Sequence, residues 1–137
     1  MVDRNPLPMW HFGWVTLLGD AAHPMYPVGS NGASQAIIDA RELALQPSIE
    51  AAIAAYDAQR RPQTASVVQA NRQGGPEKCL EIVEQRAPDG FVDLDTVISR
   101  AELEEIARSY KRTAAFDPEV LNNRPSLGVG QPSTHGR

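Results

Sequence analysis

The residues with the clearest capacity for chemistry lie between Gly19 and Gly32, in the sequence GDAAHPMYPVGSNG. Two prolines and three glycines in so short a stretch exclude a regular helix or strand, so a shaped loop is predicted. The carboxylate of Asp20 is suited to accepting hydrogen bonds from sugar-like hydroxyl groups. Glycines such as Gly29 and Gly32 let a backbone approach a flat ring without an intervening β-carbon. Together these residue types predict a loop that binds a cofactor.

The elements on either side would position this loop. The apolar and partly β-branched run WVTLL at residues 14–18 predicts a short buried strand that ends at the loop. After the loop, small and apolar residues at helical spacing predict a helix over residues 33–44, with Ser30 or Asn31 as its cap. A strand, a glycine-rich turn and a helix N-terminus present backbone N–H groups to an anionic or electron-rich ligand.

Further helices are predicted along the rest of the chain. One opens at Ser48 and is expected to end or kink at Pro62, and another runs from there to Arg72. Short helices are expected over residues 77–86 and after Ser99, which stands at the start of a capping box. The chain is therefore expected to be mainly α-helical with a short β segment.

Composition and charge narrow the class of protein. The 137 residues leave room for one ordinary domain, and 42% apolar with 22% charged residues is typical of a soluble globular protein. The net charge of -4, with scattered basic residues, gives nucleic acid no electrostatic attraction. Cys79 is the single cysteine, which excludes an intrachain disulfide and a structural zinc site. No membrane-spanning run and no export signal is evident, so a cytoplasmic protein is expected.

The ordered residues of the loop and its flanks resemble a known family, the para-hydroxybenzoate-hydroxylase-like flavoprotein monooxygenases. The second flavin-contacting motif of that family reads approximately GDAAH, two or three variable residues, P-x-G, then a small-residue turn into a helix ending in DA. This chain has LLGDAAH at residues 17–23, then Pro27, Gly29 and Gly32, and IIDARELA at residues 37–44. The segment YDAQRRP is similar to the family's YxxxRRP stretch. The loop is most similar to that of the phenazine- and salicylate-hydroxylase branch.

The resemblance implies a fold and a division of the chain. The chain would be a C-terminal fragment of the α/β, Rossmann-like FAD/NAD(P)-binding fold of a flavoprotein monooxygenase. Residues 1–75 would form the flavin-contacting segment, with the strand, the GD loop and helices. Residues 76–116 would form a helical C-terminal segment. Residues 117–137 are rich in Asn, Pro, Ser and Gly and are expected to be a flexible tail.

The resemblance also implies roles for the matching positions. The Asp20 carboxylate would bind a hydroxyl group of the FAD ribityl chain, with Gly19 permitting the approach. Pro27 would lie beside the isoalloxazine ring, and the N–H groups of Gly32 and Ala33 would face its pyrimidine part. The complete set of residues expected to contact FAD is Gly19, Asp20, Pro27, Gly29, Asn31, Gly32, Ala33 and Ser34. No catalytic side chain and no metal ligand is predicted.

The function implied is the FAD-binding part of an enzyme that hydroxylates an aromatic substrate with NAD(P)H and O₂. The family's GxGxxG fingerprint for the FAD pyrophosphate is absent from the 137 residues, so the isolated chain is expected to be incomplete and inactive. Three accounts remain open: a partial product, one half of a split enzyme that docks on a separate FAD-binding chain, or a non-catalytic helical scaffold. The first two predict an exposed apolar face, and a weakly soluble or self-associating chain is expected.

Several other residues have alternative interpretations. His23 has no second ligand at metal-binding spacing, which favours structural hydrogen bonding over a general-base or metal role. Arg60 and Arg61 are expected to form surface or interdomain salt bridges in preference to contacting a phosphate. Tyr26 could contact substrate or pack against the loop, with neither alternative favoured. Cys79 is expected to be an inert thiol.

Overall fold

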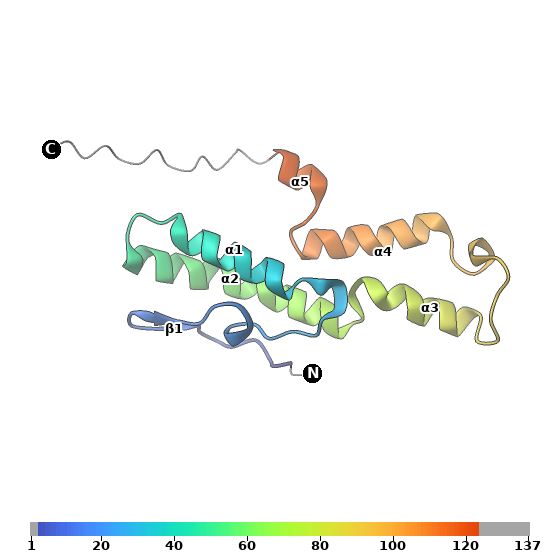
Figure 1. The fold of residues 1–137 in the computed structure, drawn as a ribbon, viewed down its shortest axis with the longest axis horizontal. Coiled ribbons are helices and arrows are strands. Elements are labelled where there is room, and N and C mark those ends of the chain that lie inside the picture. Colours follow the sequence, from blue (N-terminus) through green and yellow to red (C-terminus); the bar gives the residue numbers. More distant parts are fainter. Residues whose placement is uncertain (1–2, 124–137) are drawn as a thin grey trace.

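A computed structural model of the chain describes residues 3–123, and these form an elongated, mainly helical molecule (Figure 1). The expected mainly α-helical class with a short β segment is confirmed. Short 3₁₀ turns lie at Gly19–Ala21, Val28–Ser30, Gly75–Glu77 and Leu94–Thr96. The strands and α-helices are β1 (His11–Phe12), β2 (Val15–Thr16), α1 (Gly32–Ala44), α2 (Ile49–Arg72), α3 (Lys78–Arg86), α4 (Arg100–Thr113) and α5 (Pro118–Asn123).

The β segment is a small antiparallel hairpin. His11 pairs with Thr16 and Phe12 with Val15, and the expected buried strand over residues 14–18 is reduced to the two residues of β2. Trp14 lies in the turn and is 66% exposed, and Val15 is 70% exposed. The prediction of a buried strand is therefore wrong, because the apolar run pairs only with its own N-terminal neighbours and one face of the hairpin has no described layer against it.

Helices α1 and α2, each predicted from the sequence, pack along one another (Figure 1). Ser48 caps α2, because its hydroxyl accepts a hydrogen bond from the Ala51 N–H at 3.3 Å. The structure differs from expectation at Pro62, where one continuous helix replaces the two predicted segments. Burial of Val67 and Val68 in the following turns favours continuation, and such packing overrides the low helix propensity of proline.

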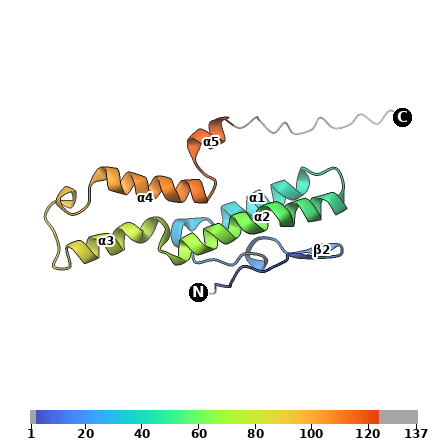
Figure 2. The same cartoon turned by 180° about the vertical axis from the view of Figure 1, so that it is seen from behind.

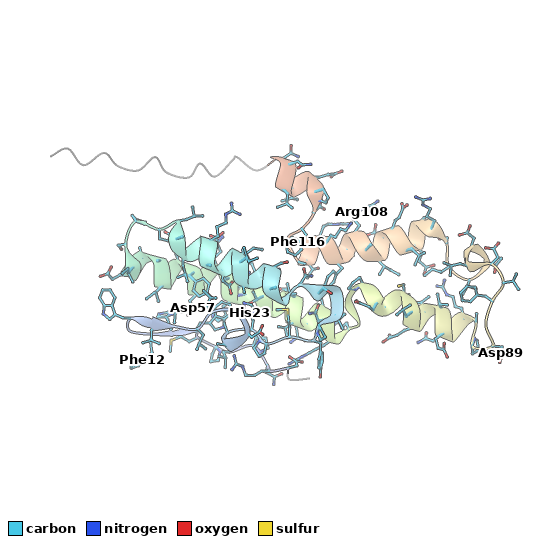
Figure 3. The ribbon with its side chains drawn as sticks, viewed as in Figure 1. Phe12, His23, Asp57, Asp89, Arg108 and Phe116 are labelled. Atoms are coloured by element: carbon cyan, nitrogen blue, oxygen red, sulfur yellow. The ribbon has the colours of Figure 1, made fainter. Side chains whose placement is uncertain are left out.

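The first core cluster lies between the hairpin and the helix pair. Trp10, Ala22 and Tyr56 are buried there, with partly buried leucines around them. The Trp10 and Tyr56 rings are 5.3 Å apart, within the range of favourable aromatic pairs. Figure 3 shows His23 and Asp57 in the layer between the hairpin side and the helices. This layer fixes the start of the loop at residues 19–32 to α2.

The C-terminal part forms a second helix pair, α3 and α4, beyond one end of the first (Figure 2). After α2 ends, Gly74 adopts φ +90°, a left-handed conformation that suits glycine and turns the chain. The capping role predicted for Ser99 is confirmed, since its hydroxyl accepts from the Glu102 N–H at 3.2 Å. The Glu102 carboxylate binds Arg86 of α3 at 2.8 Å and joins the two helices.

The segment expected to be a flexible tail is described only up to residue 123. Residues Pro118–Asn123 of that segment form the short helix α5, a difference from the expectation. The rest of the expected tail, residues 124–137, lies outside the described residues. Within residues 3–123, no helix combines the length and the apolar character that a membrane crossing requires.

Candidate cofactor site

The GD motif begins the site with a buried, left-handed glycine. Gly19 has φ +58°, and its N–H donates to Oδ2 of Asp39 at 3.2 Å. A β-carbon at Gly19 would lie 3.2 Å from the Cβ of Ala36 in α1, so a side chain here would be both strained and crowded. This glycine therefore fixes how closely the loop approaches α1.

Asp20 lies at the surface beside the N-terminus of α1. Its carboxylate is exposed, and a β-carbon added to Gly32 would have Oδ1 of Asp20 as its nearest neighbour at 3.8 Å. A carboxylate and the positive end of a helix dipole thus face the same space. The carboxylate can accept hydrogen bonds from ligand hydroxyl groups in that space.

The first amide groups of α1 are available to a ligand. The Asn31 side chain makes no capping bond to its own helix, although Asn is a preferred N-cap residue. Over the described range 3–123, the N–H groups of Gly32, Ala33 and Ser34 meet no hydrogen-bond acceptor. Unpaired amides at a helix start are suited to an anionic or electron-rich group.

The proline-glycine turn has a strained backbone. Pro27 is exposed, and its carbonyl accepts from the Ser30 N–H at 3.0 Å. Gly29 and Ser30 both have positive φ, +71° and +52°, and the second of these is unusual for a residue with a side chain. Neighbouring side chains must hold such a backbone in place.

The loop faces Tyr110 of α4 on its inner side. A β-carbon on Gly29 would overlap the Tyr110 ring, so the space beside this glycine is filled by protein and not left for a flat cofactor. The Asn31 side chain is buried and donates from Nδ2 to the Tyr110 hydroxyl at 2.9 Å. Of the eight expected cofactor-contacting residues, Gly29 and Asn31 therefore both lie against Tyr110 of α4.

A buried ionic cluster centred on Asp39 supports the GD motif from behind. Asp39 is 0% exposed and accepts from Nε2 of His23 at 2.6 Å, Nε of Arg60 at 2.8 Å and the Gly19 N–H. Burial alone would raise the pKa of Asp39, but hydrogen bonds from His23 and Arg60 hold it below the usual value. The ionised carboxylate thus joins the loop, α1 and α2 at one point.

The contacts of this cluster test the roles that the sequence suggested for His23 and Arg60. Structural hydrogen bonding by His23 is confirmed. The expectation of a surface or interdomain salt bridge is wrong for Arg60, which is buried and also donates from Nη2 to Oε1 of Gln35 at 2.6 Å. The correction has a physical reason, because an arginine on the buried face of α2 needs an internal carboxylate such as Asp39.

A second cluster ties the hairpin to α2. Asp57 accepts from the backbone N–H of Trp10 at 3.1 Å, from Nδ1 of His11 at 2.7 Å and from Nε of Arg61 at 2.7 Å. Tyr56 beside it donates its hydroxyl to the Leu17 carbonyl at 3.1 Å. The YDAQRRP stretch is therefore the scaffold that positions the segment entering the loop.

Sequence reasoning missed Asp39, Asn71 and Tyr110 as supporting residues. Asp39 lies in an otherwise apolar stretch of α1, and a charge there signals a buried partner. Tyr110 is buried on α4, and its hydroxyl also donates to Oδ1 of Asn71 at 2.6 Å. A buried tyrosine needs a hydrogen-bond partner, which is the one signal that could have pointed to this contact. Tyr26 is partly exposed, and its role stays open.

The chemistry of the site fits FAD, the cofactor that the resemblance implies. An exposed carboxylate can bind hydroxyl groups such as those of a ribityl chain, and free amides can donate to the carbonyl oxygens of an isoalloxazine ring. Both lie at the same helix start, where a β-carbon on Gly32 would project into the space they share. In the described part of the chain, no group of three or more His, Cys, Asp or Glu side chains could hold a metal ion.

Comparison with known proteins gives a family match over residues 2–71, just over half of the chain, to the family described as FAD binding domain. The phenazine 1,6-dicarboxylic acid hydroxylase of Lysobacter antibioticus is 60% identical over 77 residues, which are 53% of this chain and 19% of that protein. The 3-hydroxybenzoate 6-hydroxylase 1 of Aquipseudomonas alcaligenes is 48% identical over 71 residues, 49% of this chain and 18% of that protein.

A third relative, the 6-hydroxynicotinate 3-monooxygenase of Pseudomonas fluorescens, is 40% identical over 73 residues, 49% of this chain and 19% of that protein. The matches thus span about a fifth of the length of each of these relatives. No solved structure significantly matches the chain.

Proposed function

This chain belongs to the FAD binding domain family of aromatic-hydroxylase-like flavoprotein monooxygenases, and from that premise we propose that its loop and α1 hold the flavin end of FAD. The proposed contacting residues are those expected from the sequence: Gly19, Asp20, Pro27, Gly29, Asn31, Gly32, Ala33 and Ser34. In this proposal Gly29 and Asn31 contribute their backbone to the site, while their contacts with Tyr110 hold that backbone in place.

One observation carries the proposal. The exposed Asp20 carboxylate and the unpaired amides of Gly32, Ala33 and Ser34 lie at the same helix start. An acceptor of hydroxyl hydrogen bonds beside several N–H donors is the combination that a ribityl chain joined to an isoalloxazine ring needs. Preorganised amides of this kind stabilise developing negative charge by about 3 kcal/mol per donor in other enzymes.

We propose aromatic hydroxylation as the activity of the whole enzyme. The substrate C–H becomes C–OH, NAD(P)H gives up a hydride and the solvent gives up a proton; one oxygen atom of O₂ enters the hydroxyl group and the other leaves as water. When bound, FAD supplies the redox chemistry of this reaction. The residues of this chain bind and orient its flavin end, with Asp20 accepting hydrogen bonds and the amides donating them.

The names of the relatives support a class of substrate. They act on a phenazine dicarboxylic acid, a hydroxybenzoate and a hydroxynicotinate, as their names state. We therefore propose that the substrate is an aromatic carboxylic acid. We also propose that the enzyme acts in the cytoplasm, where a lone cysteine such as Cys79 stays reduced.

The exposed apolar surface supports a partner for this chain. Phe12 is 85% exposed, and Figure 3 shows it projecting from the hairpin away from the helices. Trp14 and Val15 of the same hairpin are also largely exposed, so the hairpin presents an open apolar surface. We propose that polypeptide carrying the Rossmann-like, dinucleotide-binding part of the flavoprotein fold covers this surface, whether in the same protein or as a separate chain.

A flavin titration tests the proposed function. The purified chain should quench riboflavin and FAD fluorescence weakly but saturably at micromolar concentrations. Asp20→Asn should lower the affinity about tenfold or more, because a hydrogen bond to a charged group is worth about 1.5–3 kcal/mol. Asp89→Asn is the matched control, since Asp89 is an exposed aspartate at the far tip of the α3–α4 connection (Figure 3).

Two outcomes would contradict the proposal. Flavin binding that is equally strong in the Asp20→Asn and Asp89→Asn variants would remove Asp20 from the site. No saturable binding by any of the three proteins would favour the non-catalytic helical scaffold, the alternative in which the motif is present but holds no cofactor.

A further inference from the structure

The segment beyond the family-matched residues 2–71 returns to the cofactor loop. The C-terminal end of α4 lies beside the N-terminal end of α1 in both views (Figures 1 and 2). A hydrogen bond from Nε2 of Gln35 to the Ala114 carbonyl at 3.0 Å joins these two ends. Helix α4 therefore forms part of the structure that surrounds the site, although the family match does not include it.

Three side chains hold the loop from its inner side, and we name Asn71, Glu77 and Tyr110 the loop clamp. Nδ2 of Asn71 donates to the Tyr26 carbonyl at 3.0 Å. Oε1 of Glu77 accepts from the Gly29 N–H at 3.0 Å. The clamp thus fixes the backbone on both sides of Pro27, where the loop is strained.

Tyr110 makes the contact with the largest consequence. Its hydroxyl accepts from Nδ2 of Asn31 at 2.9 Å and donates to Oδ1 of Asn71 at 2.6 Å. Burial raises the pKa of Tyr110, so the hydroxyl stays protonated and able to donate. The Val28 carbonyl lies 3.3 Å from the same hydroxyl as a further acceptor. The position of the Asn31 side-chain amide is therefore set by α4.

The Asn31 side chain would otherwise compete with a ligand for the amides of α1. Asn is among the strongest N-cap residues, and Asn31 occupies the N-cap position. Its side chain points to Tyr110, and its backbone has helical angles, φ −97° and ψ −11°, in place of the extended conformation typical of a capping residue. As a result, the amide groups at the start of α1 remain unpaired.

We propose that Tyr110 is a positioning residue for the flavin site. By holding the Asn31 side chain away from the N-terminus of α1, it keeps the amides of Gly32, Ala33 and Ser34 free for the isoalloxazine ring. This role rests on the proposed function, because it assumes that those amides bind flavin. It assigns to the C-terminal helix pair a function in cofactor binding that the family match does not include.

A double-mutant cycle tests the proposal with riboflavin as the probe. Tyr110→Phe keeps the ring but removes the hydroxyl, so Asn31 is released to cap α1 and the riboflavin affinity should fall about fivefold, the ratio set by a typical N-cap. In the Asn31→Ala background no cap can form, so adding Tyr110→Phe should change the affinity by less than about twofold. Equal losses in both backgrounds would overturn the proposal.

Hydrogen exchange of backbone amides gives a second readout that needs no ligand. In Tyr110→Phe the Ser34 amide should exchange about fivefold more slowly, because the released Asn31 side chain pairs with it. Tyr56→Phe is the matched control, since it removes another buried hydroxyl and should leave Ser34 exchange unchanged. Unaltered Ser34 exchange in Tyr110→Phe would refute the positioning role. The expected exchange pattern without any flavin binding would instead refute the proposed function and leave the contact intact.

Discussion

At the scale of single residues, Gly29 and Gly13 have similar backbones in different surroundings. Both have positive φ, +71° and +56°, but a β-carbon would overlap Tyr110 at Gly29 and meet nothing within 4 Å at Gly13. Gly13→Ala should therefore lower the free energy of unfolding only by the left-handed strain, about 1–2 kcal/mol. Gly29→Ala should add a packing cost of about 1–3 kcal/mol. Urea unfolding measures both variants, and equal losses would show that Tyr110 does not fill the space beside Gly29.

The Asp39 cluster predicts a large stability effect of a small substitution. Asp39→Asn keeps the size of the side chain but leaves buried Arg60 without its carboxylate, so the free energy of unfolding should fall by about 3–5 kcal/mol. Glu104→Gln removes a carboxylate from an exposed pair with Arg100 and should leave unfolding nearly unchanged. Thermal and urea unfolding of both variants check the difference.

The same carboxylate sets a pH dependence whose sign follows from its lowered pKa. A carboxyl group with a lower pKa in the folded state contributes its full stability above the unfolded value of about 3.9. That contribution is lost as the pH falls through the lower, folded pKa, with His23 and Arg60 the hydrogen-bond partners that face the carboxylate. The wild type should lose stability in acid more steeply than Asp39→Asn. If the stabilities of the wild type and of Asp39→Asn fall in parallel as the pH is lowered, Asp39 is not the cause of the acid sensitivity. Asp57, whose pKa is also lowered, is present in both proteins and would then be the cause.

The residue types in the sequence identify the loop, but they do not identify the distant side chains that hold it in place. Gly19, Asp20 and the residues after Pro27 form a contiguous motif, so their shared location follows from the sequence alone. Asp39 and Arg60 are 21 positions apart, and Tyr110 is 79 positions from Asn31. Such pairs meet only when the helices pack, and no local spacing reveals them.

At the scale of elements, helices were predictable where caps and stop signals agree with packing. Ser48 and Ser99 cap their helices as the sequence indicates, and the Gly-Gly pair at 74–75 ends α2. Pro62 illustrates the limit, because a local signal for a break is overridden by burial of the following turns. The hairpin illustrates another limit, because an apolar run of five residues does not reveal which other strand it pairs with.

The hairpin also predicts an association property of the chain. Its exposed Phe12 and Trp14 should promote self-association in the absence of other polypeptide to cover them. Phe12→Ser should weaken dimerisation about tenfold, because burying a side chain of this size contributes about 1.5–3 kcal/mol. Val92→Ser is the control, since Val92 is fully exposed but lies on the α3–α4 connection. Sedimentation velocity gives the comparison, and equal dimerisation of the two variants would exclude the hairpin as the contact.

At the scale of the whole molecule, two helix pairs meet at the loop of residues 19–32. The first pair and the hairpin carry the family motif, and the loop clamp holds the loop through Asn71 of α2, Glu77 of the turn before α3 and Tyr110 of α4. The proposed contacts involve only the ribityl chain and the isoalloxazine ring, because Asp20 and the α1 amides are the groups that face the open space. The GxGxxG fingerprint that would bind the pyrophosphate is not in the sequence.

Because the proposed contacts reach only the ribityl chain and the ring, they predict the relative affinities of the chain for different flavins. Riboflavin, FMN and FAD share the ring and the ribityl chain, so their dissociation constants for this chain should agree within about threefold, a difference below 1 kcal/mol. ADP, which carries only the other end of FAD, should not compete. Fluorescence titration with ADP competition gives the ranking. FAD bound tenfold more tightly than riboflavin, or displaced by ADP, would mean that residues outside the loop also bind the adenosine diphosphate part. Asp20→Asn should weaken all three flavins equally, because each presents the same ribityl hydroxyl groups to that carboxylate.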